Sequence, residues 1–157
     1  ETFAKWLETE RIVCQPSYRL PTVIHPATST DIYGGSLYKA EGGDINRLEQ
    51  DLIMELTALP NVRWWHRNLS RHGFAINGYT KHYPDIMIMT QSGKVIFAET
   101  KGEHLKNDDS REKIELGRAW RTAAGSQYRY YMVFRDGENL LPGAVSMSQF
   151  VETVKAL

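Results

Sequence analysis

The chain has 157 residues and carries 19 lysines and arginines against 19 aspartates and glutamates, so its formal net charge is zero. This length suits one domain, and 41% hydrophobic with 24% charged residues is typical of a globular protein. A neutral total excludes a histone-like polycation and, taken alone, argues against binding nucleic acid through bulk charge. The single cysteine, Cys14, excludes an intrachain disulfide and a cysteine-rich zinc site, and it favours a reducing, cytoplasmic setting.

Residues 1–43 differ from the rest of the chain because they are rich in proline and glycine. We expect a short helix over 1–10 and extended pieces around 12–13, 18–20 and 37–38, in an N-terminal extension that packs on a core of residues 44–157. The chain begins at Glu1, so we expect it to be a fragment of a longer protein. No apolar run is long enough to predict a membrane span, and no signal peptide is visible.

From residue 44 onward the sequence predicts alternating helices and strands. Asp44 is a suitable N-cap, and apolar residues recur at helical spacing from Ile45 to Leu59. Two of the predicted strands are joined by the turn Gln91–Gly93 and should form a hairpin. The expected elements are a helix at 45–59, strands at 62–67, 86–90 and 94–101, a helix at 111–124 capped by Asp109 or Ser110, a strand at 128–134 and a helix at 148–156. This order predicts an α/β fold with a mixed central sheet flanked by helices.

The hairpin carries two acids and a lysine. Asp85 follows Pro84 at the start of the first strand, a position that proline tolerates because it cannot donate a ladder hydrogen bond. Glu99 and Lys101 are two residues apart on the second strand, so their side chains share one face. Because the strands run antiparallel, the start of one lies beside the end of the other, and Asp85 should meet Glu99 and Lys101.

A third acid, Glu49, falls inside the apolar face of the first predicted helix. A carboxylate rarely lies within a buried stripe unless it is paired or bound to a metal. Two interpretations stay open: Glu49 belongs to a metal site together with the hairpin acids, or it forms a partly buried salt bridge with an arginine or lysine.

This set of residues suits phosphodiester hydrolysis with Mg²⁺, for which Mn²⁺ could substitute. Mg²⁺ takes oxygen ligands and usually accepts one or two carboxylates, here Asp85 and Glu99, with Glu49 in the first or second shell. The backbone carbonyl of Thr100 is a further candidate ligand, and Lys101 could orient the attacking water or stabilise the transition state. Alone, a Glu-x-Lys is usually a surface pair and a Pro-Asp a turn, but the joint pattern is more specific than its parts.

The stretch 61–84 contains no acid and interleaves basic with aromatic residues, which suits a groove that follows a phosphate backbone. We expect Arg67, Arg71 and Lys81 to face DNA. The alternative is a core strand with two tryptophans followed by a solvated loop. His104, close behind Lys101, and Lys113, on the second main helix, are further candidates for contact with the phosphates.

Together these features resemble the PD-(D/E)xK nuclease superfamily, in which Pro84-Asp85 and Glu99-Thr100-Lys101, separated by thirteen residues (86–98), match the defining motif. More narrowly, the stretch from about Gly42 to Phe134 is similar to the C-terminal nuclease domain of type III restriction subunits and related helicase-like defence proteins. The segments that carry this likeness are Asn46–Glu49, Trp64–Asn68, Gly73–Gly78, Tyr83–Asp85, Glu99–His104 and Leu116–Trp120.

The resemblance implies a restriction-endonuclease-like core of order α-β-β-β-α-β in residues 44–157. It implies Mg²⁺-dependent cleavage of DNA that leaves 5′-phosphate and 3′-hydroxyl ends, with Asp85 and Glu99 on the metal, Lys101 catalytic and Glu49 as the helix acid. Such subunits carry an ATPase motor, yet no G-x-x-x-x-G-K-[ST] motif occurs here, so we expect a fused or associated helicase or specificity module. A homodimer could cut both strands, whereas the competing hypothesis is a non-cleaving DNA-binding or assembly module of the same fold.

Overall fold

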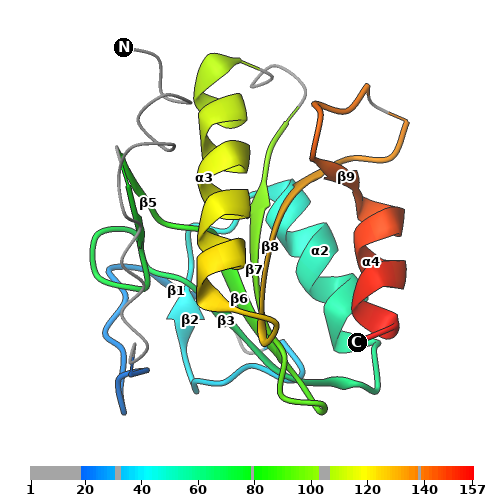
Figure 1. Ribbon diagram of the computed structural model, residues 1–157. Helices are drawn as coiled ribbons and strands as arrows, with labels where there is room; N and C mark the ends of the chain where they lie inside the picture. The colour runs from blue at the N-terminus through cyan, green and yellow to red at the C-terminus, as the bar shows by residue number, and fades with distance from the viewer. Residues whose placement is uncertain (1–18, 31–32, 79, 103–106, 138) are drawn as a thin grey trace.

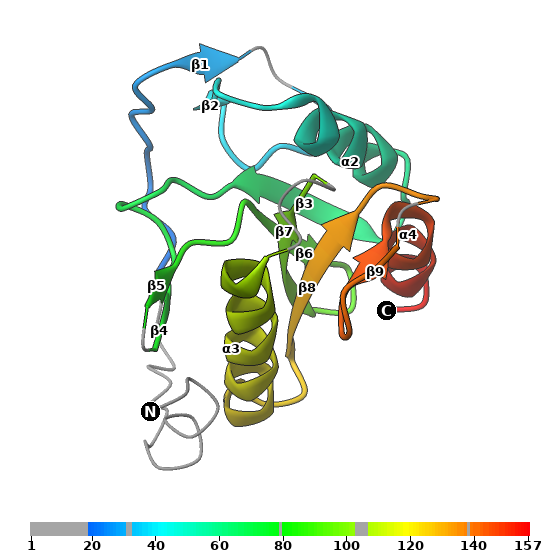
Figure 2. The same cartoon turned by 90° about the horizontal axis from the view of Figure 1, so that it is seen from above.

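A five-stranded sheet forms the centre of the molecule, and helices cover both of its faces (Figures 1 and 2). The computed structural model describes residues 19–30, 33–78, 80–102, 107–137 and 139–157. The strands lie side by side in the order β3 (Val62–Arg67), β6 (Ile86–Thr90), β7 (Val95–Thr100), β8 (Tyr128–Phe134) and β9 (Val145–Ser146). The pairs β3–β6 and β6–β7 are antiparallel, whereas β7–β8 and β8–β9 are parallel, so the sheet is mixed as predicted.

Side-chain alternation along the central strands builds one core on each face of the sheet. Ile86, Ile88, Ile96 and Ala98 pack with apolar residues of α2 (Arg47–Thr57) and α4 (Met147–Lys155). Residues of opposite parity, such as Met87 and Phe97, pack beneath α3 (Asp108–Ala124). Figure 2 shows α3 on one side of the sheet and α2 and α4 on the opposite side. Glu99 and Lys101 continue the row of residues that faces α3.

The helix starts differ from those predicted, because asparagine side chains cap both helices. Asn46, not Asp44, caps α2: its side chain accepts hydrogen bonds from the N–H groups of Leu48 and Glu49. Glu49 completes a capping box by accepting the N–H of Asn46. Asn107 caps α3 by accepting the N–H of Ser110, so this helix begins before the expected position at 111.

The long strands were predicted well, whereas the two-residue strands were missed. The sequence did not indicate β1 (Ser29–Thr30), β2 (Glu41–Gly42), β4 (Ile76–Asn77), β5 (Lys81–His82) or β9. The extended piece expected at 37–38 is not a strand, because the chain turns there and pairs at β2 instead. The expected helix at 1–10 and the extended piece at 12–13 lie outside the described residues, and residues 19–20 form no strand.

The described part of the N-terminal segment is held on β3 by hydrogen bonds. Trp65 donates its indole N–H to the carbonyl of Gly34 at 2.8 Å. Glu41 is 1% exposed and its carboxylate accepts the N–H of Arg67 at 3.1 Å while lying 2.8 Å from Nδ1 of His66. In the part of the chain that the structure describes, no helix is long and apolar enough to cross a membrane.

Candidate active site

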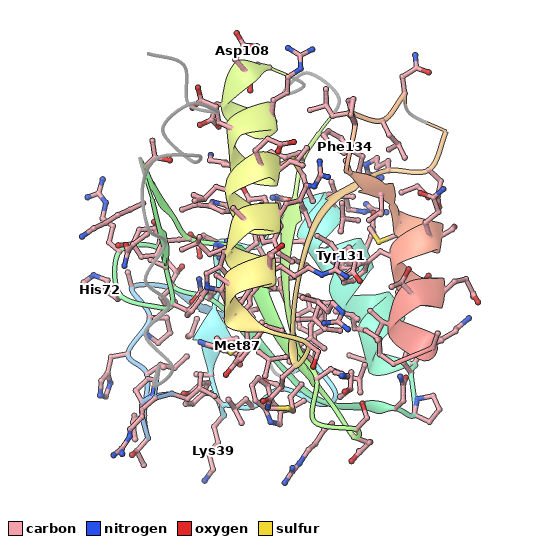
Figure 3. All side chains as sticks on the ribbon, viewed as in Figure 1. Lys39, His72, Met87, Asp108, Tyr131 and Phe134 are labelled. Carbon is pink, nitrogen blue, oxygen red and sulfur yellow. The ribbon has the colours of Figure 1, made fainter. Side chains whose placement is uncertain are left out.

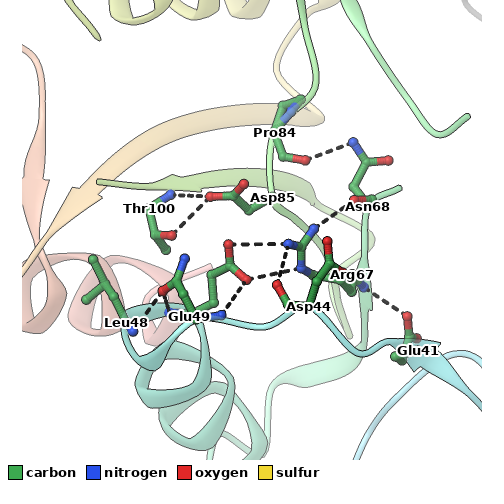
Figure 4. A network of polar contacts seen from close by, with 10 residues as sticks. Glu41, Asp44, Leu48, Glu49, Arg67, Asn68, Pro84, Asp85 and Thr100 are labelled. Carbon is green, nitrogen blue, oxygen red and sulfur yellow. Dashed lines mark hydrogen bonds and ion pairs between the residues drawn. The ribbon is translucent and has the colours of Figure 1, made fainter. Parts of the chain in front are cut away.

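Asp85 lies beside the end of β7, where the acids and the lysine converge. The β6–β7 register pairs Ile86 with Ala98, so the preceding Asp85 falls opposite Glu99. Its Oδ2 accepts two hydrogen bonds from Thr100, one from the backbone N–H at 2.8 Å and one from Oγ1 at 3.0 Å (Figure 4). The hairpin thereby fixes one Asp85 oxygen and leaves the other for a ligand.

Glu99 and Lys101 form a close ion pair within the site. Nζ of Lys101 lies 2.6 Å from Oε1 of Glu99, and the Glu99 side chain is 5% exposed. The second oxygen, Oε2, is buried and has no hydrogen-bond partner among the residues that the structure describes. An unpaired buried carboxylate oxygen is costly, and a bound cation is one way to satisfy it.

The electrostatics of the site also favour a cation. Burial and then the charge of Asp85 raise the pKa of Glu99 to about 8. The same two causes raise the pKa of Glu49 to about 7, although Arg67 opposes them. Burial lowers the pKa of Lys101, but the charge and hydrogen bond of Glu99 outweigh it, so this pKa lies above its usual value. The charge of Asp85 therefore acts on two poorly solvated carboxyls, Glu99 and Glu49.

Glu49 forms the salt bridge that the sequence left open as an alternative. Its Oε2 lies 3.1 Å from Nε of Arg67 and its Oε1 lies 3.4 Å from Nη2 (Figure 4). Arg67 also donates to the carbonyls of Asn68 at 3.1 Å and Asp44 at 3.4 Å, and its side chain is 11% exposed. Arg67, expected to face DNA, is thus engaged inside the protein, where it joins β3 to the start of α2.

The Thr100 carbonyl points to the β6 side of β7, the side on which Asp85 lies. The N–H of Lys101 donates to the carbonyl of Val133 on β8. The carbonyl of Thr100, on the other side of the same peptide group, therefore points the opposite way, toward β6. Extending the β6–β7 register sets Thr100 opposite Pro84, which has no N–H to donate to that carbonyl. The carbonyl oxygen of Thr100 is therefore placed as a candidate metal ligand.

The oxygen ligands of Asp85 and Glu99 fit a magnesium ion better than a metal ion whose ligands must all come from protein side chains. Among the described residues, no group of three or more His, Cys, Asp and Glu side chains could hold a metal ion. Mg²⁺ keeps several waters and accepts one or two carboxylates, a demand that Asp85 and Glu99 meet. The partnerless Oε2 of Glu99 is the observation that supports this fit.

The other predicted DNA-contact residues differ in their availability. Arg71 is exposed in the loop after β3, where it adopts a left-handed backbone conformation with φ 66°, and Lys81 is exposed on β5. Lys113 on α3 is 22% exposed and pairs with Asp109 at 2.7 Å. His104 lies outside the described residues. Arg71 and Lys81 are thus the cations that can reach a phosphate without breaking a described ion pair.

A buried His82–Tyr130 pair, which sequence reasoning missed, lies behind the carboxylates. Nε2 of His82 is 2.8 Å from the Tyr130 hydroxyl. Burial, and then the charges of Lys113 and Lys101, lower the pKa of His82 to about 3, so it is neutral. Burial, and then Glu99 and Asp85, raise the pKa of Tyr130. The available signal in the sequence was Gly117 in the middle of α3, because a Cβ there would lie 2.1 Å from the Tyr130 ring.

Comparisons with known proteins add nothing to this geometry. The scan against protein-family models, the search of curated proteins and the search of solved structures each returned no match. What the site does must therefore be inferred from its own residues.

Proposed function

We propose that the chain is a Mg²⁺-dependent endonuclease domain of the PD-(D/E)xK type that hydrolyses phosphodiester bonds in DNA. The observation that carries this proposal is the convergence of Asp85, Glu99 and Lys101, in which one buried Glu99 oxygen lacks a partner. The order α2-β3-β6-β7-α3-β8 supports it, since this is the order expected of a restriction-endonuclease-like core.

Each residue has a distinct role in this proposal. Asp85, Glu99 and the Thr100 carbonyl would hold Mg²⁺, which when bound would acidify a coordinated water and neutralise charge on the phosphate. Lys101 donates a hydrogen bond to the attacking water or to the phosphate oxygens, and Glu99 fixes its position at 2.6 Å. Glu49, held by Arg67, adds negative charge at the metal's edge.

Two features of the chain, its net charge and its one proposed active site, bear on which partners it needs. A protein without net charge binds DNA weakly, so we propose that a fused or associated helicase-like module of a restriction or anti-phage system delivers it. One such site cuts one strand, so a double-strand break would require two copies of the domain or two successive events.

A cleavage assay tests the proposed function directly. The purified chain is incubated with plasmid and Mg²⁺ or Mn²⁺, with EDTA as the control for metal dependence. We expect Asp85→Asn and Lys101→Ala to reduce cleavage by at least about 100-fold, as is usual when a preorganised catalytic contact is lost. Lys155→Ala, a remote ion-paired lysine on α4, is the matched control and should cleave normally. Undiminished cleavage by either site variant would refute the proposal.

The second candidate is a nuclease-fold module that binds DNA or assists assembly without cutting. It is favoured by the two internal ion pairs, Glu49–Arg67 and Lys101–Glu99, which occupy the charged groups of the site. In that case no product forms with either metal, and calorimetric titration detects no Mn²⁺ binding that depends on Asp85. Metal binding that Asp85→Asn abolishes would favour the endonuclease instead.

A further inference from the structure

A pocket of about 600 Å³ opens beside Asp85, on the β3 side of the site. Its walls come from residues 25–28 and 67–70 and from Gly42, Asp44, His72 and Tyr83. The volume falls within the range of about 300–1,000 Å³ that is typical of small-molecule sites. Asp85 forms part of the wall, so whatever occupies the pocket lies next to the residue that we propose binds the metal.

Several polar groups on the pocket wall have no partner among the described residues. The carboxylate of Asp44, the imidazoles of His25 and His72 and the hydroxyl of Tyr83 form no hydrogen bond or ion pair within the described part of the chain, and His72 is exposed at the edge of the molecule (Figure 3). By contrast, Asn68 on the same wall is fully engaged with Phe74 and Pro84. The pocket therefore offers a hydrogen-bond acceptor and aromatic rings to a ligand.

Gly42 keeps space open beside Asp44. A Cβ on Gly42 would lie 3.4 Å from Oδ1 of Asp44 and 3.3 Å from the side chain of Leu69. These distances are tighter than most real Cβ contacts, so any larger residue would narrow the pocket next to its free carboxylate. The pocket's shape thus depends on a residue without a side chain.

The charge of the lining argues against a phosphate in the pocket. Asp44 and Asp85 are acidic, and the one arginine on the wall, Arg67, is already paired with Glu49. A phosphate would be repelled there, whereas a neutral, planar heterocycle with amino donors fits both the aromatic rings and the Asp44 carboxylate.

We propose that this pocket binds one unpaired base of the substrate strand, next to the phosphate that a metal ion on Asp85 and Glu99 would hold. This inference rests on the proposed function and narrows its substrate to DNA that is single-stranded at the cut, such as a flap or a frayed end. A base inside a duplex is stacked and paired, so it enters such a pocket only after it has been extruded. Asp44 accepts a hydrogen bond from the exocyclic amino group of cytosine, which thymine lacks.

Fluorescence anisotropy with labelled oligonucleotides tests the proposal without cleavage, since Ca²⁺ replaces Mg²⁺. The probes are short oligo-dC and oligo-dT of equal length and a duplex of the same length. We expect oligo-dC to bind more tightly than the duplex and than oligo-dT. Ala27→Leu, which fills the pocket, should weaken oligo-dC binding by about tenfold, the scale of losing one stacked base. The control Ala123→Leu lies on the exposed side of α3 and should bind normally.

A second variant examines the role of the carboxylate. Asp44→Ala should remove the preference for oligo-dC over oligo-dT while leaving oligo-dT binding unchanged. Equal affinity of Ala27→Leu and the unmodified chain, or a preference for the duplex, overturns the inference. Cleavage of a 5′-flap substrate in Mg²⁺ that depends on Asp85 but is unaffected by Ala27→Leu would refute the base pocket and leave the proposed endonuclease standing. Absence of flap cleavage alongside oligo-dC binding that Ala27→Leu weakens would refute the endonuclease and leave the pocket standing.

Discussion

Glu99 combines burial, an ion pair with Lys101 and a carboxylate oxygen without a partner, a combination that is costly in the absence of a cation. Its pKa of about 8, together with the pKa of about 7 for Glu49, means that the folded chain without metal retains protons that the unfolded chain releases near pH 4.5. Because both values are raised, the contribution of these two carboxyls to stability is greatest below pH 4.5 and is lost as pH rises through 7 and 8.

We therefore predict that, in EDTA, the unfolding free energy drops on the order of a few kcal/mol between about pH 5 and pH 8. Saturating Mg²⁺ should restore most of it at pH 8, because it stabilises the ionised acids. Thermal unfolding followed by circular dichroism measures both effects. Glu99→Gln should flatten the profile, whereas Glu152→Gln, on exposed α4, should not. A stability in EDTA that stays constant over this range would contradict the prediction.

Arg67 is predicted to be a positioning residue for Glu49, because its donors bind Glu49 and two backbone carbonyls. Arg67→Gln should lower the rate of cleavage by about tenfold or more, the usual effect of losing a group that orients a metal-site acid. The variant should also shift the pH dependence of the cleavage rate to higher pH, since Arg67 lowers the pKa of Glu49 and its removal would raise that pKa. DNA affinity, measured separately by anisotropy, should change little.

Arg71→Gln is the matched comparison, because Arg71 is exposed in the loop that follows β3. It should weaken DNA binding and leave the maximal rate unchanged. If Arg67→Gln instead weakened DNA binding and spared the rate, the sequence expectation that Arg67 contacts DNA would be correct and the positioning role wrong.

At the scale of elements, α3 depends on a close approach to β8 at Gly117. A Cβ at this position would lie 2.1 Å from the ring of Tyr130, which also holds His82. Gly117→Ala should therefore destabilise the fold by about 1–3 kcal/mol despite the better helix propensity of alanine, because the ring must move. Chemical denaturation measures the loss. Ala123→Gly, at an exposed site of the same helix, should cost only about 1 kcal/mol, and a stabilised Gly117→Ala would show that the ring yields easily.

The same elements show what the sequence could predict. Strands 62–67, 86–90 and 128–134 were predicted correctly, because each is rich in β-branched, apolar or aromatic residues and is followed or preceded by turn residues. The two-residue strands β4 and β5 carry too little pattern to detect, and they form because their partners meet in space. Asp85 and Glu99 were expected to meet because the turn at 91–93 fixes the hairpin register, and the structure places them opposite each other. The His82–Tyr130 pair depends on α3 packing, which no local pattern encodes.

At the scale of the whole molecule, the net charge of zero matters less for DNA binding than which basic side chains are exposed near the proposed site. The basic side chains of the acid-free stretch 61–84 differ in their exposure: Arg67 is turned inward, whereas Arg71 and Lys81 are exposed to solvent. A bound DNA strand therefore meets few unpaired basic side chains near Asp85. The affinity of the protein for this DNA should depend on contacts with a nucleobase in the pocket more than on contacts with phosphates.

The salt dependence of binding expresses this balance as a number. Each phosphate contact on a single strand contributes about −0.7 to the slope of log affinity against log salt concentration. With Arg71 and Lys81 as the exposed basic side chains, we predict a slope between about −1 and −3. Lys81→Gln should reduce the magnitude of this slope by about 0.7. Anisotropy titrations with oligo-dC across a salt series, in Ca²⁺, provide the measurement. A slope steeper than about −5 would mean that phosphate contacts dominate, and the chain would then bind nucleic acid through a basic surface rather than through the pocket beside Asp85.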